Sequence, residues 1–195
     1  MSMPGQADRL RSPFFLREGN VVLRPFTRRN LNSSDYLRWM NDPRVTRTIG
    51  RFDYLFPVSK AKLVAYFNNI DTDTTMFLAI YARRSPRASE QFVGTLKIYD
   101  LDQLARRASI GIVVGDPKAW GQGIASAAIR AACRFIFDEL GFRKVTAGYH
   151  AINIGMRRAF EKNGFHVEGV LREQLYFRGG VVDHILVSKF GEGKI

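Results

Sequence analysis

The sequence predicts a single mixed α/β domain in which helices pack on a central sheet. The chain has 195 residues, 46% of them hydrophobic, which is enough for one sizeable core and short for two domains. Short runs rich in β-branched residues alternate with segments of helical periodicity. We find no internal repeat, low-complexity region or interdomain linker. Such an order of elements is typical of helices layered on one sheet.

Prolines and helix-capping residues mark the ends of the predicted strands and helices in the first half of the chain. Pro25 stops a short β-branched run, so that run indicates a strand. Ser33 or Ser34 can cap the first helix, and the Asp42-Pro43 pair ends it. The predicted elements are a strand at 21–25, helices at 33–43 and 59–69, and strands at 76–82 and 92–99.

Glycines punctuate the second half. Gly141 is placed to end a long helix in the left-handed conformation, and Gly164 closes a shorter one. Arg178-Gly179-Gly180 is typical of a hairpin turn between the last two strands. The predicted elements are a strand at 108–114, a helix at 124–140, a strand at 144–149, a helix at 153–163, and strands at 170–177 and 181–190.

The ends of the chain are predicted to lie outside this domain. We expect a flexible lead over residues 1–19, one domain over 20–190 and a tail over 191–195. The lead lacks the continuous apolar stretch of a signal peptide. No run approaches the roughly 18 apolar residues of a membrane helix. We therefore expect a cytoplasmic protein with no membrane partner.

The charge favours anionic partners. The chain carries 30 Lys and Arg against 18 Asp and Glu, a formal net charge of +12. The excess is dispersed, with no block of five or six like charges, so we expect no nucleic-acid partner. Its one cysteine, Cys133, lies within a predicted helix and is interpreted as a small buried residue. One cysteine and three histidines make a poor ligand set, so we expect no metal.

A glycine turn ahead of the long helix, Trp120-Gly121-Gln122-Gly123, indicates an anion site. The first N–H groups of a helix are unpaired, and glycines let a phosphate approach the backbone. The P-loop pattern is absent, because no Gly-Lys-Ser/Thr follows the strand. The dinucleotide fingerprint matches only in part, and no acidic residue ends the next strand. The pattern that fits is [QR]xxGxG/A, with Lys118 at its first position.

At this turn the chain resembles the GNAT superfamily of acetyl-CoA-dependent N-acetyltransferases. The supporting segments occur in order along about residues 20 to 190: VVLRPF, LRWMNDPRV, ASIGIVVGDPKAWGQGIASAA, NIGMRRAFEKNGF and VEGVLREQLYFRGGVVD. The set is similar to the branch of ribosomal-protein, polyamine and nucleotide-amino-sugar acetyltransferases. The resemblance implies a mostly antiparallel sheet with a splayed, V-shaped opening and helices on both faces.

The same resemblance implies how acetyl-CoA is held. In the family, the strand before the turn pairs its free backbone groups with the pantetheine arm, and the N–H groups of the turn hold the pyrophosphate. Lys118 would add a point charge to the pyrophosphate, and Asn153 matches an asparagine that bonds the pantetheine arm. The residues assigned to the cofactor are Ile112, Val113, Val114, Lys118, Trp120, Gly121, Gln122, Gly123, Ile124, Ala125 and Asn153.

The implied reaction is direct attack of a neutral primary amine on the thioester. The backbone N–H of Val114 is the expected oxyanion donor. Relatives carry a tyrosine or a serine at positions that are Phe160 and Met156 here, so both customary hydroxyls are missing. His150, at the end of its strand, is a candidate proton carrier. Further candidates are Glu173, Tyr176, Asp183 and His184 on the final hairpin, and Tyr99 and Asp100.

The acceptor amine stays open at this point. A basic chain is a poor host for a polyamine, and better suited to an anionic amine such as an amino-sugar nucleotide. A protein N-terminus is an alternative. Arg38, Trp39, Arg44 and Arg47 are candidates to stack on or pair with the acceptor, although Trp39 is expected more strongly in the core.

An alternative of another class is a non-catalytic acetyl-CoA sensor or an RNA- or ribosome-binding module, which the missing hydroxyls permit. A homodimer is possible, as in many relatives.

Overall fold

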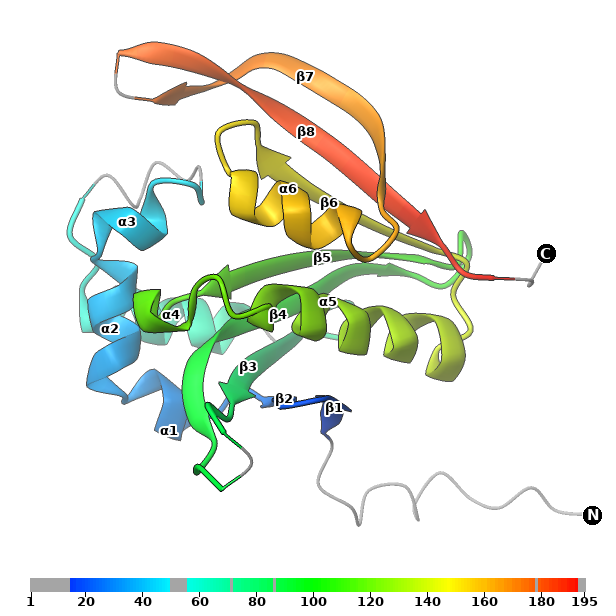
Figure 1. Ribbon diagram of the computed structural model, residues 1–195. Coiled ribbons are helices and arrows are strands. Elements are labelled where there is room, and N and C mark those ends of the chain that lie inside the picture. The colour runs from blue at the N-terminus through cyan, green and yellow to red at the C-terminus, as the bar shows by residue number, and fades with distance from the viewer. Residues whose placement is uncertain (1–14, 50–55, 71, 86, 178, 193–195) are drawn as a thin grey trace, which may run out of the picture.

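The computed structural model describes residues 15–49, 56–70, 72–85, 87–177 and 179–192, and its centre is an eight-stranded sheet in the order β1-β2-β3-β4-β5-β6-β8-β7 (Figure 1). Every neighbouring pair is antiparallel except β5 and β6, which are parallel. The strands are β1 (Leu16–Glu18), β2 (Val21–Pro25), β3 (Met76–Ala82), β4 (Gln91–Asp102), β5 (Arg107–Val114), β6 (Lys144–His150), β7 (His166–Phe177) and β8 (Gly180–Phe190). The α-helices are α1 (Arg28–Leu31), α2 (Ser34–Met40), α3 (Pro43–Thr46), α4 (Lys60–Ile70), α5 (Ile124–Arg134) and α6 (Ile154–Glu161).

The predicted mixed α/β fold is confirmed, and the differences lie at element ends. β1 falls inside the predicted flexible lead, because residues 16–18 pair with β2. Residues 1–14 and 193–195 lie outside the described residues, as does Arg178 of the predicted hairpin turn. The predicted helix 33–43 is two helices, since Asp42 caps α3 with Pro43 at its start. The short helix α1 was not predicted; a capping box of Thr27 and Asn30 begins it.

Two apolar clusters cover the two faces of the sheet. One joins α5 to residues such as Ile110, Val145 and Val187 on its face of the strands. The other packs helices of the first half, through residues such as Trp39 and Leu63, against β3 and its neighbours. Helices therefore lie on both faces, as the resemblance implied.

The predicted long helix ends as expected. α5 continues as a π-helical turn over Phe135–Glu139, and Gly141 follows with φ 65°. Cys133 is buried in the core, and burial raises the pKa of its thiol to about 12, so it is a packing residue. No helix among the described residues is long and apolar enough to span a membrane.

The sheet opens between its two parallel strands. β5 and β6 pair only where residues 107–109 face residues 144–146. Beyond that point β5 stays paired with β4 as far as Val114, and β6 stays paired with β8 as far as His150. The two halves of the sheet thus diverge in a V, and Figure 1 shows α6 lying over the opening.

Candidate functional site

A cleft of about 780 Å³ occupies this opening and is lined by β4, β5 and β6, the turn before α5, α6 and the α2–α3 region. Of the residues predicted to hold the cofactor, nine line it: Ile112, Val113, Val114, Trp120, Gly121, Gly123, Ile124, Ala125 and Asn153. Lys118 and Gln122 are not among the described residues of its lining, nor are the predicted catalytic residues His150, Glu173 and Tyr176.

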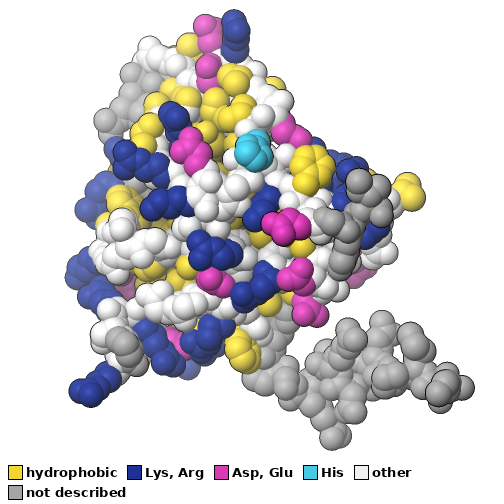
Figure 2. Space-filling view, turned by 45° about the vertical axis from the view of Figure 1, so that its right-hand side comes forward, with side chains coloured by type: hydrophobic (Ala, Val, Ile, Leu, Met, Phe, Trp, Pro, Cys, Tyr) yellow, Lys and Arg dark blue, Asp and Glu magenta, His cyan; other side chains and the backbone are white. Residues whose placement is uncertain are grey.

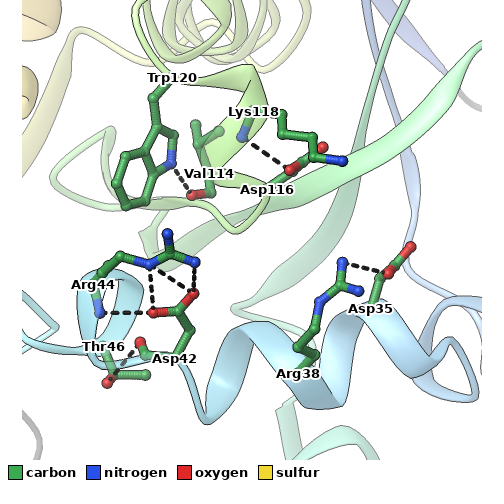
Figure 3. Close-up of polar contacts among 9 residues, drawn as sticks. All are labelled: Asp35, Arg38, Asp42, Arg44, Thr46, Val114, Asp116, Lys118 and Trp120. Carbon is green, nitrogen blue, oxygen red and sulfur yellow. Dashed lines mark hydrogen bonds and ion pairs between the residues drawn. The ribbon is translucent and has the colours of Figure 1, made fainter.

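The open edge of β5 presents backbone groups to the cleft. Gly115 donates its N–H to the carbonyl of Val93 on β4, at 2.9 Å. Because backbone groups alternate in direction along a strand, those of Val114 point away from β4. The indole Nε1 of Trp120 donates to the Val114 carbonyl oxygen at 2.7 Å, which agrees with that direction (Figure 3). The N–H of Val114 thus lies on the side where the oxyanion role requires it.

The turn before α5 keeps its N–H groups available. Asp116 begins it by accepting a hydrogen bond from the backbone N–H of Lys118 (Figure 3). Gly121 and Gly123 both have φ of 75°, a conformation that other residues adopt at a cost. Gly123 is the N-cap of α5 and has no side chain to bond the first helical N–H groups. The first turn of α5 therefore offers unpaired donors and the positive end of the helix dipole to an anion.

The polar side chains of the turn serve the turn itself. Gln122 donates from Nε2 to the carbonyl oxygen of Lys118 at 2.6 Å, which holds the loop closed. The Lys118 side chain is exposed outside the cleft. Its predicted contact with the pyrophosphate stays a prediction that needs the side chain to reach the bound phosphates.

Asn153 caps its helix and lies in the cleft, while its contact with the pantetheine arm stays a prediction. Its Oδ1 accepts a hydrogen bond from the N–H of Met156 at 3.1 Å and caps α6, and the residue also lines the cleft. Met156 and Phe160 line the cleft too and are apolar, as the sequence indicated. The ring of Tyr149 lies against Phe160, with 6.0 Å between centroids, and brings a phenol into the lining. Sequence reasoning missed Tyr149, which was taken only as the end of a strand.

The five candidate proton carriers on β6 and the hairpin separate into a pair of histidines and three residues in or beside an irregular part of the hairpin. His150 is 7% exposed, and its ring meets His184 edge-to-face with 5.7 Å between centroids. Glu173 and Tyr176 are exposed on β7, the edge strand of the sheet. Glu173 has φ of 50°, and its N–H donates to Oδ1 of Asp183 at 2.8 Å, which marks an irregular point in the hairpin ladder. The catalytic roles of these residues stay predictions.

Of the residues suggested for the acceptor, Trp39 lies in the core, as was expected more strongly. Trp39 is 2% exposed and packs in the core against Phe92, so it cannot stack on an acceptor. Arg38 pairs with Asp35 at 2.7 Å and lies outside the lining of the cleft. Arg44 lines the cleft and forms an ion pair with Asp42, as Figure 3 shows.

The charge of the cleft has one sign. Its lining contains Arg44, Arg47, Lys97, Arg158 and Lys162. No Asp or Glu occurs in that lining among the described residues. On the face drawn in Figure 2, Lys and Arg side chains are interspersed with Asp and Glu. The cleft is therefore more strongly cationic than the face drawn there, and it suits an anionic ligand.

The sequence profile of the acetyltransferase (GNAT) domain matches residues 20–166. The chain belongs to this family. It is an acetyl-CoA-dependent N-acetyltransferase, and acetyl-CoA is its cosubstrate. The splayed strand, the glycine turn and the cleft that they border accord with that cosubstrate.

Relatives and solved structures agree with the family. This acetyltransferase is 26% identical over 136 residues to the probable N-acetyltransferase YjcK of Bacillus subtilis, covering 69% of this chain and 72% of that protein. Its fold is similar to Mycobacterium smegmatis RimJ, solved with CoA-disulfide, with TM-score 0.75 and 22% identity, covering 92% of this chain and 87% of the other. It is also similar to spermidine N-acetyltransferase from Vibrio cholerae, solved with CoA and spermine. The TM-score is 0.74 and the identity 20%, and the match covers 88% of this chain and 95% of the other.

The paired histidines predict how the stability of this acetyltransferase depends on pH. Burial lowers the pKa of both His150 and His184, and the charge of His184 lowers that of His150 further. The unfolded chain therefore binds protons more readily than the folded chain once the pH falls below about 6.5. We therefore expect the free energy of unfolding to be highest above that pH. It should decrease as the pH falls toward the lowered pKa values that His150 and His184 have in the folded chain.

Melting temperatures at about pH 7.5 and pH 5.5 test this expectation. The decrease in melting temperature between these two pH values should be smaller in a His150→Gln, His184→Gln double variant. It should be unchanged in His166→Gln, because His166 is exposed. An equal loss in the double variant and the wild type would contradict it.

Proposed function

We propose that the acceptor is a primary amine that carries negative charge elsewhere in the molecule, such as an amino-sugar nucleotide. The observation that carries this proposal is the lining of the cleft, with five cationic side chains and no carboxylate among the described residues. Two of them, Arg158 and Lys162, lie on or directly after α6, beside the turn that would hold the coenzyme phosphates. The acceptor end of the cleft has Arg47, Lys97 and Arg44, of which Arg44 is ion-paired with Asp42.

The same charges favour the reactive form of the amine. A cationic neighbour raises the free energy of an ammonium ion, so it lowers the pKa of the acceptor amine. The neutral amine then attacks the carbonyl carbon of the thioester, and the N–H of Val114 stabilises the oxyanion. Pantetheine lies along Ile112 to Val114, the N–H groups from Trp120 to Ala125 hold the pyrophosphate, and Asn153 bonds the arm. The resemblance implies these assignments, and the directions of the Val114 backbone groups and of the first N–H groups of α5 support them.

A polycationic acceptor fits the cleft poorly. Spermidine would bring several ammonium groups to a lining without a carboxylate, and each would be repelled by like charge. A protein N-terminus brings only one ammonium group, so the cationic lining repels it less than it repels spermidine. It therefore stays the second candidate. A sensor or an RNA-binding module would bind without transferring the acetyl group.

Two measurements test the proposal in sequence. Acetyl-CoA at millimolar concentration should raise the melting temperature, since a ligand that binds only the folded state stabilises it. Release of CoA thiol is then measured with a UDP-linked amino sugar, spermidine and a peptide with a free N-terminus. We expect turnover with the first of these. Turnover with spermidine alone would overturn the proposal, and salt-sensitive RNA binding without thiol release would favour the binding-module alternative.

Two exposed arginines of neighbouring helices provide a matched pair of variants. Arg47 follows α3 and lines the cleft, whereas Arg38 lies on α2 outside it. Loss of one charged hydrogen bond costs about 1.5 kcal/mol, so Arg47→Gln should raise the KM for the anionic acceptor roughly 10-fold. Arg38→Gln should leave it unchanged. Equal KM values in the two variants would remove Arg47 from the acceptor site.

A further inference from the structure

The apex of the opening is a hydroxyl pair between the parallel strands. Ser109 on β5 and Thr146 on β6 are the last paired residues, and their side-chain oxygens lie 2.9 Å apart. Side chains alternate along a strand, so the next residues on the same face are Gly111 and Gly148. Both line the cleft. The first position beyond the apex therefore has no side chain on either strand, and the sheet is open there.

This face of the sheet is the one opposite α5. Val113, which is two residues beyond Gly111, packs with the α2 and α4 cluster, whereas Ile110 belongs to the α5 cluster. We call the opening beside Gly111 and Gly148 the glycine gap. On one face of the sheet it leads to the cofactor turn, and on the other to Lys97 and the α2–α3 residues of the cleft.

Each glycine lies under a ring from the neighbouring strand on its outer side: Tyr99 of β4 over Gly111, and His184 of β8 over Gly148. A Cβ built on Gly111 would meet Cε1 of Tyr99 on β4 at 3.6 Å, and Lys97 Nζ lies 4.1 Å from the centre of the same ring. A Cβ on Gly148 would lie 2.3 Å from Nε2 and 2.9 Å from Cε1 of His184 on β8, a distance that no alanine could keep. Because Gly148 has no side chain, the His184 imidazole packs directly against the backbone of Gly148, which lines the cleft.

We propose that His184 accepts the proton that the acceptor ammonium loses, at the gap that Gly111 and Gly148 leave in the sheet. The ammonium gives one proton to the imidazole, and the resulting amine forms the bond to the thioester carbon. The C–S bond then breaks, the second proton of the nitrogen passes to the CoA sulfur, and the imidazolium returns its proton to water. The inference rests on the acetyl transfer itself, and not on the identity of the acceptor.

The surroundings of His184 keep its imidazole ready to accept. Burial lowers its pKa, so the ring is neutral at neutral pH. From β6 it faces His150, which packs beside it as a positioning residue. Lys97 and Tyr99 lie on the Gly111 side of the gap, on β4, where they are paired with Gly111 and Ser109. Its partner on β7 is the apolar Leu171. Burial and Asp100 raise the pKa of the Tyr99 phenol, which therefore stays protonated.

Nuclear magnetic resonance tests the position of His184 without any acceptor. The chain has three histidines, so His→Gln variants assign their ring signals. Binding of acetonyl-CoA, a non-transferable analogue of acetyl-CoA, should shift the signals of His184 and leave those of His166 unchanged. If amide signals of the α5 turn shift while His184 does not, the analogue is bound and the proposal is overturned. Failure of the turn signals to shift would instead contradict the assigned cofactor site.

Kinetics with the best amine of the panel test the chemical role. General-base catalysis contributes about 100-fold or more, so His184→Gln should lower kcat by that factor and remove the acidic limb of the pH–rate profile. The Kd of acetyl-CoA should be unchanged, and His166→Gln should behave as the wild type. Gly148→Ala should also lower kcat, because it displaces the imidazole. A wild-type kcat and pH profile in His184→Gln would overturn the proposal.

Discussion

Gly123→Val is expected to weaken acetyl-CoA binding roughly 100-fold while the domain remains folded. Gly123 caps α5 with φ of 75°, a region in which a β-branched residue is strongly disfavoured. No atom lies within 4 Å of an added Cβ, so the core is not disturbed. The turn must change its backbone conformation instead, and its N–H groups no longer converge on one anion. A loss of about 3 kcal/mol of binding free energy raises the Kd of acetyl-CoA roughly 100-fold.

Isothermal titration with acetyl-CoA measures this loss, and Gly141→Val is the matched control. Gly141 lies beyond the other end of the same helical run, has φ of 65° and also has no atom within 4 Å of an added Cβ. The two variants should lose similar stability, and only Gly123→Val should bind acetyl-CoA more weakly. Gly121→Val should behave as Gly123→Val does, since its φ is also 75°. Normal affinity in a folded Gly123→Val protein would contradict the pyrophosphate site.

Gly94→Ala is expected to cause the largest loss of stability of the strand glycine variants. Gly94 lies on β4 opposite Val114. An added Cβ would be 2.2 Å from the carbonyl oxygen of Val113 and 3.0 Å from Cα of Val114, and both atoms belong to the backbone. Backbone cannot rotate away as a side chain does, so β4 and β5 must separate. We expect a cost of about 3 kcal/mol, the upper part of the range for overpacking.

Gly169→Ala provides the comparison for this prediction. Gly169 is a strand glycine of β7, and its added Cβ would meet Leu186 at 3.8 Å, an ordinary contact. Thermal unfolding should show a decrease of roughly 6–12 °C for Gly94→Ala and little change for Gly169→Ala. Because Val114 moves with β5, the KM for acetyl-CoA should rise in Gly94→Ala as well. Equal melting temperatures in both variants would show that β5 tolerates the added methyl group.

That most of the residues assigned to the cofactor line one cleft was predictable, because most of them are close together in the sequence. One strand, one turn and one helix start supply Val114, Gly121 and Gly123, and local rules for strands, left-handed glycines and helix caps apply to each. Asn153 was predictable for the same reason, since it caps the helix that it begins. The position of Lys118 in the motif was also evident, but the direction of its side chain was not.

The acceptor half depended on contacts between distant segments. Trp39 could have faced the acceptor or the core, and only its packing against Phe92 and under Gly115 decided for the core. His150 and His184 are far apart in the sequence, and the register of β6 with β8 brings them together. The same register places His184 over Gly148, a contact that no local pattern records.

The sequence by itself determined the class of fold, most strands and helices, and the turn that precedes α5, because periodicity, caps and left-handed glycines act over a few residues. Only the tertiary structure decided where β5 leaves β6, that Gly111 and Gly148 both line the cleft beyond the Ser109–Thr146 pair, and that the lining of the cleft is cationic. The physical reason is that sheet register and burial are set by long-range packing, which brings side chains together regardless of their spacing in the chain.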